Sequence, residues 1–276
     1  MIIGFGDLAT RALPHFRQVA EVMGVSRNPE RLSDATHKRI YGDYSSVEGL
    51  AEAAKTQPDY LIFTPVPSSR DVTGYSQGYA KAAQNIADAG LLKGVRRAIF
   101  VSSTRVYAEK SGGWVEEDSP LAAGDPFVDA LLTAEACFRR SVTTTVVRPS
   151  GLYDGANPIM LRPILEGRSS RINDGFTNRI HRDDAAAVIA ELVKRDIRGE
   201  RLPATLNLND DTPVTTRELE AWCFSTLGRE PLRERDNQPR ANRRVSNVKL
   251  RAMGMSLRYP SFREGYEGAL SLAASS

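Results

Sequence analysis

Short apolar runs alternate with helical patterns along the first 150 residues of the chain. The runs are rich in β-branched residues and bounded by Gly, Pro or Ser, which is typical of strands buried in a sheet. They lie at Met1–Ile3, Val19–Val25, Tyr60–Val66, Ala98–Val101 and Thr144–Val147. Stretches with a helical period separate them at Leu8–Gln18, Val47–Lys55, Gly78–Gly90 and Asp129–Arg140. This alternation predicts right-handed crossovers and a parallel sheet with helices on both faces.

The pattern loosens after Pro149, where loops and short elements replace the regular alternation. We therefore expect one α/β domain over residues 1–276, a Rossmann-type doubly wound parallel sheet with a small C-terminal substrate lobe. Residues 1–150 would form mainly the dinucleotide-binding part. Residues 151–276 would form mainly the lobe, over the carboxyl ends of the strands.

Composition limits the classes of protein to which the chain can belong. It has 276 residues, of which 41% are hydrophobic and 26% charged, so a packed core is expected. A net charge of +3 is too small to indicate nucleic acid, although RERDNQPRANRR is locally basic. No apolar run approaches the roughly 18 residues that span a bilayer, and no signal peptide is recognised after Met1. We expect a cytoplasmic protein without nucleic-acid or membrane partners.

Cysteine and histidine are scarce in this chain. Cys137 and Cys223 lie far apart, and the three histidines are scattered. These residues form neither a redox motif nor the closely spaced ligand set of a zinc site, so no metal is expected.

A glycine-rich turn joins the first predicted strand to the first predicted helix. The segment IIGFGDLATRAL carries a Gly-x-Gly-x-x-Ala pattern in this context. Gly4 permits a sharp turn, Gly6 lets the backbone approach a pyrophosphate, and Ala9 allows close packing of helix on strand. The helix N-terminus would face the negative charge. We predict a dinucleotide site at Gly4, Phe5, Gly6, Asp7, Leu8 and Ala9; the alternative is a tight turn without a ligand.

The end of the second predicted strand bears on the choice between NAD and NADP. An NAD-preferring site usually has Asp or Glu there, to bind the ribose 2′-hydroxyl. This chain has Ser26 and Arg27 instead, and arginine forms bidentate charged hydrogen bonds with phosphate. The pair favours NADP; the alternative is a surface arginine beside a site that tolerates NAD. Asp43, in YGDYSS, would meet an adenine edge; a helix N-cap at Ser45 or Ser46 is the alternative.

Several stretches together resemble one family. GFGDLA, FVSSTRVYAE, VEEDSP, VVRPSGLYD, RIHRDDAAAVI and LNLNDDTPVTTREL occur in the order and spacing of the extended short-chain dehydrogenase/reductase superfamily. This group contains the NAD(P)-dependent nucleotide-sugar epimerases and dehydratases. The tail RRVSNVKLRAMGMSLRYPSFREGY is similar to the atypical branch of the group. The resemblance covers nearly the whole chain.

The resemblance implies roles for residues at the ends of two strands. Ser103, in VSSTRVY, matches the catalytic Ser/Thr that hydrogen-bonds the reacting oxygen. Thr64 and Pro65 match the backbone that passes the pyrophosphate and ribose. Val101 and Ser102 complete this part of the predicted cofactor-binding set.

The resemblance also implies roles beyond the last predicted strand. Pro149 and Ser150, in RPSGLY, would line the nicotinamide ring. His181 and Asp183, in IHRDD, match a motif that is usually architectural.

A homodimer is a further implication. In the extended family two helices of each subunit pack into a four-helix interface, and Asp129–Arg140 occupies one of those positions. Its apolar residues exceed what one buried face needs; they are Leu131, Leu132, Ala134, Cys137 and Phe138. The alternative is that they serve only the monomer core.

The acid/base pair of the family is missing. Its tyrosine and lysine lie four residues apart, where the tyrosine exchanges the substrate proton and the lysine lowers the tyrosine pKa and holds the nicotinamide ribose. Alignment on Glu135 puts Phe127 and Leu131 at these positions, and no tyrosine in the chain is followed by lysine four residues later. Neither side chain can exchange a proton.

Four other side chains are conceivable substitutes. Tyr153 is the one we predict to assist Ser103, although packing in the lobe is an equal alternative. Tyr107, His181 and Asp129 each have a structural alternative: a packing tyrosine, a hydrogen-bonded histidine and a helix-surface carboxylate.

Two hypotheses for function follow. The first is an NADP-dependent oxidoreductase of the epimerase/dehydratase type that acts on a small carbonyl or nucleotide-sugar-like substrate. The retained Ser103 and RPSGLY favour it. The second is an NADP(H)-binding redox sensor or regulator without chemistry, which Phe127 and Leu131 favour.

Overall fold

The computed structural model describes residues 1–17, 19–32, 36–155, 161–170, 175–235 and 242–274. The chain divides into two compact units. Unit 1 comprises Met1–Val106, Leu121–Arg148 and Ala185–Leu206. Unit 2 comprises Tyr107–Pro120, Pro149–Asp184 and Asn207–Ser276. Each unit is therefore built from several separate segments of the chain.

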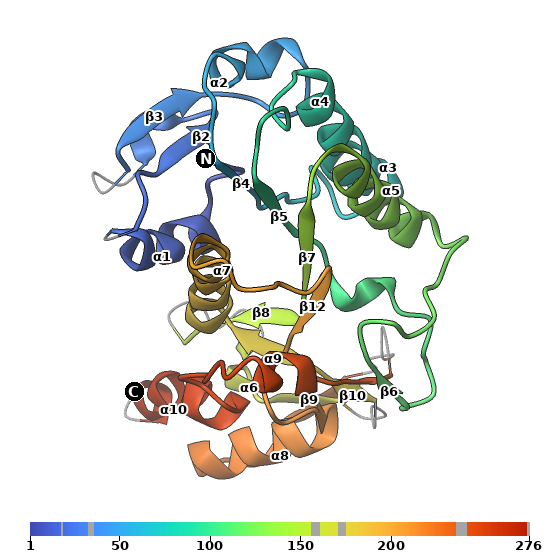
Figure 1. Cartoon of the computed structure of the whole chain (residues 1–276). Coiled ribbons are helices and arrows are strands. Elements are labelled where there is room, and N and C mark those ends of the chain that lie inside the picture. The colour runs from blue at the N-terminus through green and yellow to red at the C-terminus, as the bar shows by residue number, and fades with distance from the viewer. Residues whose placement is uncertain (18, 33–35, 156–160, 171–174, 236–241, 275–276) are drawn as a thin grey trace. The chain divides into compact units, whose positions relative to one another are not determined.

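A parallel sheet is the centre of unit 1. Among the described residues it has seven strands in the order β3-β2-β1-β4-β5-β7-β12 (Figure 1). The strands are β1 (Ile2–Ile3), β2 (Met23–Ser26), β3 (Lys38–Tyr41), β4 (Tyr60–Phe63), β5 (Arg97–Val101), β7 (Thr144–Pro149) and β12 (Thr205–Leu208). Every pairing from β3 through to β7 is parallel. The order reverses beside β1, as in dinucleotide-binding sheets, and confirms the Rossmann-type prediction.

Helices cover this sheet on both faces. Figure 1 shows α3, α4 and α5 together on one side of β4, β5 and β7, and α1 and α7 on the other. The helical segments are α1 (Asp7–Phe16), η1 (Pro29–Arg31), η2 (Glu48–Leu50), α2 (Ala51–Ala54), α3 (Val72–Tyr75), η3 (Ser76–Lys81, a π-helix), α4 (Ala82–Asp88), η4 (Thr104–Val106), α5 (Pro126–Ser141) and α7 (Arg182–Ile197, whose first turn belongs to unit 2).

Three stacked aromatic rings fix α5 on the sheet. Phe138 of α5 lies 5.1 Å from Phe100 of β5 and 5.7 Å from Phe63 of β4, between ring centroids. All three side chains are fully buried. Offset aromatic contacts of this kind contribute stability beyond their buried area. The face of α5 that carries these contacts is therefore held firmly.

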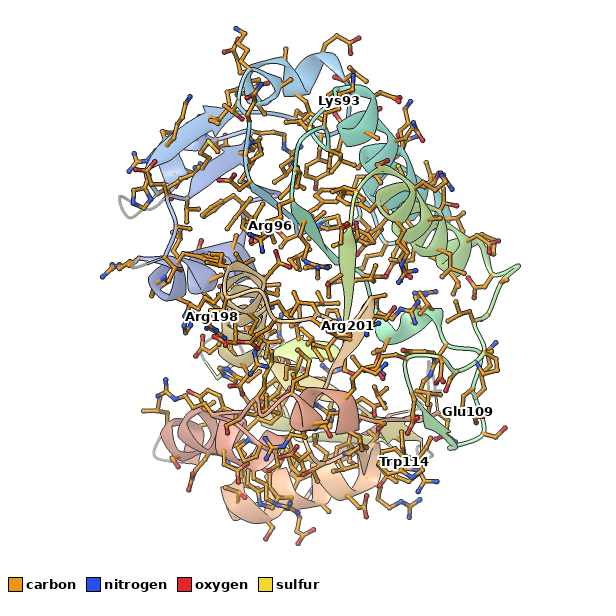
Figure 2. The ribbon with its side chains drawn as sticks, viewed as in Figure 1. Lys93, Arg96, Glu109, Trp114, Arg198 and Arg201 are labelled. Carbon is orange, nitrogen blue, oxygen red and sulfur yellow. The ribbon has the colours of Figure 1, made fainter. Side chains whose placement is uncertain are left out.

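A buried carboxylate ties the amino ends of two strands to α7. Asp196 of α7 accepts hydrogen bonds from Arg97 at 2.7 Å and from the Tyr60 hydroxyl at 2.9 Å. Arg96, labelled in Figure 2, adds an ion pair at 2.9 Å. Burial alone would raise the pKa of Asp196, but the hydrogen bonds from Arg97 and Tyr60, together with the charges of Arg97 and Arg96, lower that pKa. This cluster lies at the strand ends opposite the glycine loop.

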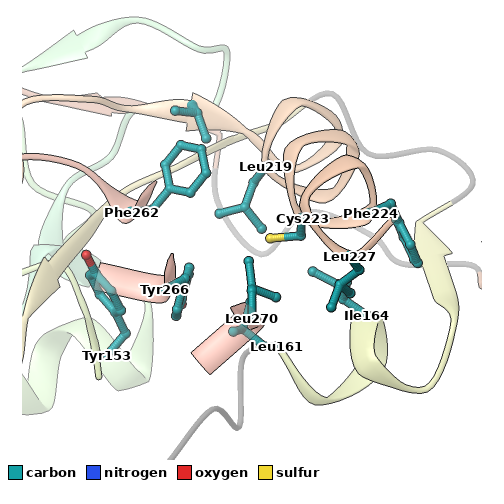
Figure 3. Packing of buried hydrophobic residues seen from close by; sticks show 11 residues of the cluster. Tyr153, Leu161, Ile164, Leu219, Cys223, Phe224, Leu227, Phe262, Tyr266 and Leu270 are labelled. Atoms are coloured by element: carbon teal, nitrogen blue, oxygen red, sulfur yellow. The ribbon is translucent and has the colours of Figure 1, made fainter. Parts of the chain in front are cut away.

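Unit 2 contains short strands and helices around its own core. The elements are β6 (Trp114–Val115), β8 (Gly151–Tyr153), α6 (Arg162–Leu165), β9 (Arg168–Ser170), β10 (Phe176–Thr177), β11 (Arg179–His181), β13 (Val214–Thr215), α8 (Thr216–Leu227), β14 (Arg233–Arg235), β15 (Arg244–Val245), α9 (Val248–Ala252) and α10 (Phe262–Ala274). Figure 3 shows the core, in which Leu219 and Cys223 of α8 meet Tyr266 and Leu270 of α10. Burial raises the pKa of the Cys223 thiol to about 12, so this cysteine is inert packing.

Asp210 is an almost fully buried carboxylate of unit 2. Burial raises its pKa from 3.8 to about 7, although the Thr212 amide and the charge of Arg179 oppose the shift. Between these pH values the folded state keeps a proton that the unfolded state has released. Stability therefore falls as pH rises from about 4 to about 7, by up to about 4 kcal/mol.

We expect Asp210→Asn to raise stability above pH 7, because the amide can still accept the Thr212 amide bond at 3.1 Å without ionising. The gain should be largest at pH 8 and should shrink towards pH 5. Urea unfolding at both pH values measures it. A gain of the same size at both would contradict the proposed ionisation.

Several predicted elements have different bounds in the structure. The strand expected at Val19–Val25 begins only at Met23, because the Val22 amide donates to the His37 imidazole at 2.9 Å. The helix expected at Leu8–Gln18 is α1, which ends at Phe16, and residue 18 lies outside the described residues. Among the described residues, no helix is both long and apolar enough to cross a membrane.

The seventh strand was not foreseen as part of the main sheet. β12 comes from the region beyond residue 150, and its neighbour in the sheet is β7. The Val146 amide donates to the Ala204 carbonyl at 3.0 Å at this edge. Most of α7 also belongs to unit 1.

Candidate functional site

The loop between β1 and α1 has the geometry expected of a phosphate-binding turn. Gly4 has φ +82°, and a Cβ there would lie 2.5 Å from the Thr64 carbonyl oxygen, so only glycine fits. The Gly6 amide donates to the Gly4 carbonyl at 2.8 Å. A Cβ on Gly6 would meet no described atom closer than 3.9 Å. The first glycine therefore serves the turn, and the space beside the second is open.

The N-terminus of α1 is left without a side-chain cap. Gly6 is the N-cap residue and forms no side-chain cap hydrogen bond. Asp7, in the first turn, pairs with Arg11 at 2.9 Å. Ala9 is buried against the sheet, while Leu8 is half-buried. Unsatisfied amides at a helix start attract an anion, which fits a pyrophosphate.

Two neighbouring side chains support the loop from either side. The Thr64 hydroxyl, just after β4, donates to the Gly4 carbonyl at 2.6 Å. Its polar group is therefore used to hold the turn. Phe5 lies over β2, where a Cβ on Gly24 would approach its ring to 2.9 Å. Pro65 follows Thr64 and is buried, whereas Val66 is exposed.

Arg27 is a cation that lies directly after β2. Its side chain is exposed and forms no hydrogen bond or ion pair with any described residue. Ser26 accepts a hydrogen bond from the Asn28 amide at 3.1 Å and so shapes this turn. Burial raises the pKa of the nearby Tyr44, and the positive charge of Arg27 opposes that shift. The five donors of Arg27 are therefore available to an anion.

Asp43 forms part of a local turn after β3. Its Oδ1 accepts a hydrogen bond from the Ser45 amide at 2.9 Å. The hydroxyl of Ser46 accepts from the Gly49 amide at 3.0 Å. Asp43 is only half-buried. Its predicted contact with an adenine edge stays a prediction.

A buried ionic network lies at the end of β5. The Ser102 hydroxyl donates to Glu135 at 2.6 Å, and Arg148 donates to both oxygens of that carboxylate, at 3.1 and 2.7 Å. All three residues are less than 6% exposed. Glu135, known from the sequence only as an alignment marker, thus ties α5 to β5 and β7. The side chain of Ser102 faces this network, and Val101 is buried beside it.

Ser103 differs from Ser102 because its hydroxyl proton is free. It follows the carboxyl end of β5, and its Oγ accepts a hydrogen bond from the Arg105 amide at 3.1 Å. Within the part of the chain that the structure describes, the hydroxyl donates to no acceptor. It is partly accessible. Ser103 can therefore donate a hydrogen bond to an added group while its oxygen is held in place.

The positions of the missing acid/base pair lie on the first two turns of α5. Asp125 caps this helix by accepting from the Phe127 amide at 2.9 Å. The Phe127 ring is half-buried and meets Tyr75 edge-on, at 5.1 Å between centroids. Leu131 is 0% exposed. Its aliphatic side chain is fully enclosed.

The conceivable substitutes have other contacts. The Tyr107 hydroxyl donates to Asn207 at 2.6 Å inside unit 2. His181 stacks on Tyr259 at 3.8 Å and accepts from the Asp183 amide at 3.2 Å. Asp129 is exposed and accepts from the Gly124 amide at 2.9 Å. These contacts are structural in kind.

Tyr153 is a packing residue of unit 2. It is 3% exposed, its hydroxyl donates to the Ser261 carbonyl at 3.1 Å, and its ring occupies the space that a Cβ on Gly265 would need. Burial raises the pKa of this tyrosine strongly. A phenol that already donates its hydrogen bond and has a raised pKa is a poor acid/base group. The predicted catalytic role finds no support in these contacts.

Pro149 is the last residue of β7 and Ser150 follows it, and both belong to unit 2 with Tyr153. The other predicted site residues belong to unit 1. The Ser150 amide donates to the Leu208 carbonyl at 2.9 Å. Its hydroxyl is buried and has no hydrogen-bond partner among the described residues. A buried hydroxyl without a partner is costly, which fits a ligand-binding role.

Sequence reasoning did not single out Arg105 and Tyr75. Arg105 lies in η4, two residues after Ser103, and its guanidinium covers the Phe127 ring. Tyr75 ends α3, which leads directly into the π-helix η3. The position of Arg105 within STRVY, two residues after Ser103, was the only sequence feature that could have drawn attention to it. No pattern indicated that α3 would bring an aromatic ring to it.

The sheet order, the glycine turn and the start of α1 are together those of a Rossmann fold. The sequence model of the family described as NAD(P)H-binding matches residues 4–196. The chain belongs to this family. No curated protein sequence matches the chain at a significant level.

Solved structures agree with this assignment. A Methylobacillus flagellatus protein, provisionally described as an NAD-dependent epimerase/dehydratase, has 27% identity and a TM-score of 0.81, over 98% of this chain and 97% of that one. A UDP-glucose 4-epimerase from Thermus thermophilus, in complex with NAD, has 18% identity and a TM-score of 0.79, over 99% of both chains. The UDP-Glc/GlcNAc 4-epimerase from Campylobacter jejuni has 16% identity and a TM-score of 0.76, over 100% of this chain and 99% of that one.

The two epimerases are similar in fold alone at these identities. Together with the family match, the Methylobacillus flagellatus structure confirms the resemblance to the NAD(P)-dependent epimerase/dehydratase group. These findings support a nicotinamide cofactor for this chain.

Proposed function

We propose that the protein is an NADP-dependent oxidoreductase of the epimerase/dehydratase type that acts on a small carbonyl or nucleotide-sugar-like substrate. One observation carries the proposal. The Ser103 hydroxyl is fixed by the Arg105 amide at 3.1 Å and keeps its proton available at the carboxyl end of β5. Ligands of doubly wound sheets bind beside these strand ends. A protein that only stored the dinucleotide would have less need of this hydroxyl.

The residues that would hold the dinucleotide fit it chemically. The open backbone at Gly6 and the uncapped start of α1 suit a pyrophosphate. Arg27, with no partner among the described residues, suits a 2′-phosphate and thus NADP. The buried Ser150 hydroxyl is a donor in need of an acceptor. When bound, the nicotinamide supplies hydride exchange with the substrate carbon.

Ser103 would orient the reacting oxygen of the substrate. Its hydroxyl donates one hydrogen bond, which is stronger towards the charged oxygen of a transition state than towards a ground-state carbonyl. Serine is a weak acid, so the proton itself must come from elsewhere. Phe127 and Leu131 cannot supply it, and the Tyr153 hydroxyl already donates its hydrogen bond to the Ser261 carbonyl. We therefore assign the proton donation to a water molecule held by Ser103.

Removal of the Ser103 hydroxyl tests the proposed reaction. We expect Ser103→Ala to lower kcat and kcat/KM at least tenfold, with unchanged affinity for NADPH, because a transition-state contact is lost. The measurement is NADPH consumption at 340 nm over a panel of carbonyl compounds and nucleotide sugars, with NADPH binding by calorimetry as the control. If the wild type binds NADPH but consumes none across the panel, a redox sensor is the better description.

The preference for NADP depends on Arg27. We expect Arg27→Ala to weaken NADPH binding about ten- to hundredfold, because the lost charged hydrogen bond is worth roughly 1.5–3 kcal/mol. NADH binding should change far less. Arg31→Ala is the matched control, since Arg31 is also exposed and lies close in the sequence. Equal losses for the two cofactors, measured by calorimetry, would show that Arg27 does not contact the 2′-phosphate.

The homodimer and the cytoplasmic location remain proposals. The apolar residues that suggested the dimer are mostly used within one chain, since Leu131, Ala134, Cys137 and Phe138 are all buried. The dimer therefore rests on the family resemblance, without help from this helix face.

A further inference from the structure

A cation held on aromatic rings takes the place of the missing tyrosine. The guanidinium carbon of Arg105 lies 4.2 Å from the centroid of the Phe127 ring and 5.2 Å from that of Tyr75. These two rings are almost perpendicular, with an interplanar angle of 85°. They form a corner around the guanidinium. Contacts of this kind attract a cation and fix its plane.

The elements that build this corner are well anchored. Phe127 lies in the first turn of α5, which Asp125 caps. Tyr75 leads into the π-helix η3, and a Cβ on Gly78 there would lie 2.6 Å from the Val66 carbonyl oxygen. The segment after β4 therefore packs directly against η3. π-helical turns frequently occur at functional sites.

The charge of Arg105 is not neutralised by the described part of the protein. Its side chain is exposed and has no hydrogen bond or ion pair with a described residue. Stacking on ring faces leaves the N–H donors at the edge of the guanidinium free. These donors match the two oxygens of a carboxylate or a phosphate.

The same residue is joined to the candidate reaction centre. The Arg105 amide donates to the Ser103 oxygen at 3.1 Å. A phenylalanine at position 127 thus loses the family's proton donor but provides a ring that holds a cation beside Ser103. Tyrosine or phenylalanine can stack on arginine, whereas aliphatic residues cannot.

We propose that Arg105, on the Phe127/Tyr75 corner, binds an anionic oxygen group of the substrate, a carboxylate or a phosphate, beside the oxygen that Ser103 orients. The inference rests on the proposed function and narrows its substrate class. The substrate is a carbonyl or hydroxy compound with a negatively charged group near its reacting carbon. The guanidinium donates hydrogen bonds that fix this group, and its charge attracts developing negative charge.

Direct binding tests the proposal independently of turnover. The Nε–H signal of Arg105 is assigned by NMR through its loss in Arg105→Leu, and malonate and inorganic phosphate are then titrated. We expect saturable shifts of this signal with an apparent Kd at least tenfold lower than for Arg263. Arg263 is the matched control because it is exposed, stacks on Phe262 at 4.9 Å and donates its amide to Ser261 at 3.2 Å. Shifts no tighter than those of Arg263 would overturn the proposal.

Steady-state kinetics test whether the bound group is a phosphate or a carboxylate. NADPH consumption is compared for dihydroxyacetone phosphate against dihydroxyacetone, and for pyruvate against its neutral amide, pyruvamide. We expect one charged compound to exceed its neutral partner at least tenfold in kcat/KM, and the better pair identifies phosphate or carboxylate. The preference should fall to about twofold or less in Arg105→Leu, stay intermediate in Arg105→Lys and survive in Arg263→Leu.

The outcomes distinguish this inference from the proposed function. Equal turnover of charged and neutral compounds, or a preference that survives Arg105→Leu, overturns the anion site while the oxidoreductase stands. Tight anion binding at Arg105 without any turnover supports the site and counts against the reaction. Because Arg105 is exposed, the variants should fold, and circular dichroism checks this.

Discussion

Gly6→Val should abolish the binding of NADPH and NADH while the protein stays folded. A side chain at this position would occupy the space beside the start of α1, where the pyrophosphate must approach the backbone. The fold itself has room for the change, because a Cβ on Gly6 meets no described atom closer than 3.9 Å. Its φ of −108° is open to any residue. Calorimetry with both cofactors measures the loss, and thermal unfolding monitors the fold.

Gly4→Ala is the matched comparison for this prediction. Gly4 has φ +82°, and an added Cβ would collide with the Thr64 carbonyl at 2.5 Å. We therefore expect this smaller substitution to lower the unfolding temperature more than Gly6→Val does. The two glycines of one motif should thus separate into a binding position and a folding position. NADPH binding by Gly6→Val at wild-type affinity would refute the role of the loop.

The strand-helix alternation was enough to predict β1, β2, β4, β5 and β7, because these strands coincide with short apolar runs between turn residues. The carboxyl ends of β1, β2 and β5, with Gly4, Arg27 and Ser103, could be located for the same reason. β3 was not among the predicted runs, since its sequence KRIY is mostly polar and only Ile40 is buried. β12 escaped prediction because its Thr205–Leu208 run is short and lies in a segment whose pattern is irregular. Its strand character depends on pairing beside β7, which is a long-range contact.

The hydrogen-bond and packing partners of individual side chains could not be predicted from the sequence. Ser102 and Ser103 are adjacent serines of equal chemistry, yet the Ser102 hydroxyl donates to Glu135, whereas the Ser103 hydroxyl donates to none of the described residues. Tyr153 has a hydroxyl in a promising motif, but α10 encloses it in the core of unit 2. The stacking of Arg105 on Phe127 joins residues 22 positions apart. Local patterns carry no information about such pairs.

Leu131 is fully buried, and this affects the result expected when the family's tyrosine and lysine are introduced at positions 127 and 131. Phe127→Tyr with Leu131→Lys would introduce both groups of the pair, a phenol and an ammonium group. Leu131 is 0% exposed, however, so an ammonium there would be taken out of water. Burial of an unpaired charge costs several kcal/mol and lowers the pKa of the lysine. We expect Leu131→Lys, alone or in the double variant, to lose this much stability in urea unfolding, whereas Leu131→Met should lose less than about 1.5 kcal/mol.

Phe127→Tyr alone should therefore be the variant that gains activity. Its ring is half-buried, and the added hydroxyl leaves the stacking with Arg105 and Tyr75 in place. The positive charge of Arg105, 4.2 Å from the ring centroid, would lower the pKa of the new phenol, as the lysine does in the family. A general acid contributes about 10²–10⁴ in rate, so we expect turnover to rise at least tenfold.

The rate of Phe127→Tyr should fall at high pH as the phenol ionises, and Arg105→Leu should move that fall to higher pH. A double variant as stable as the wild type, or a single variant with unchanged turnover and pH profile, would contradict this account of the two positions.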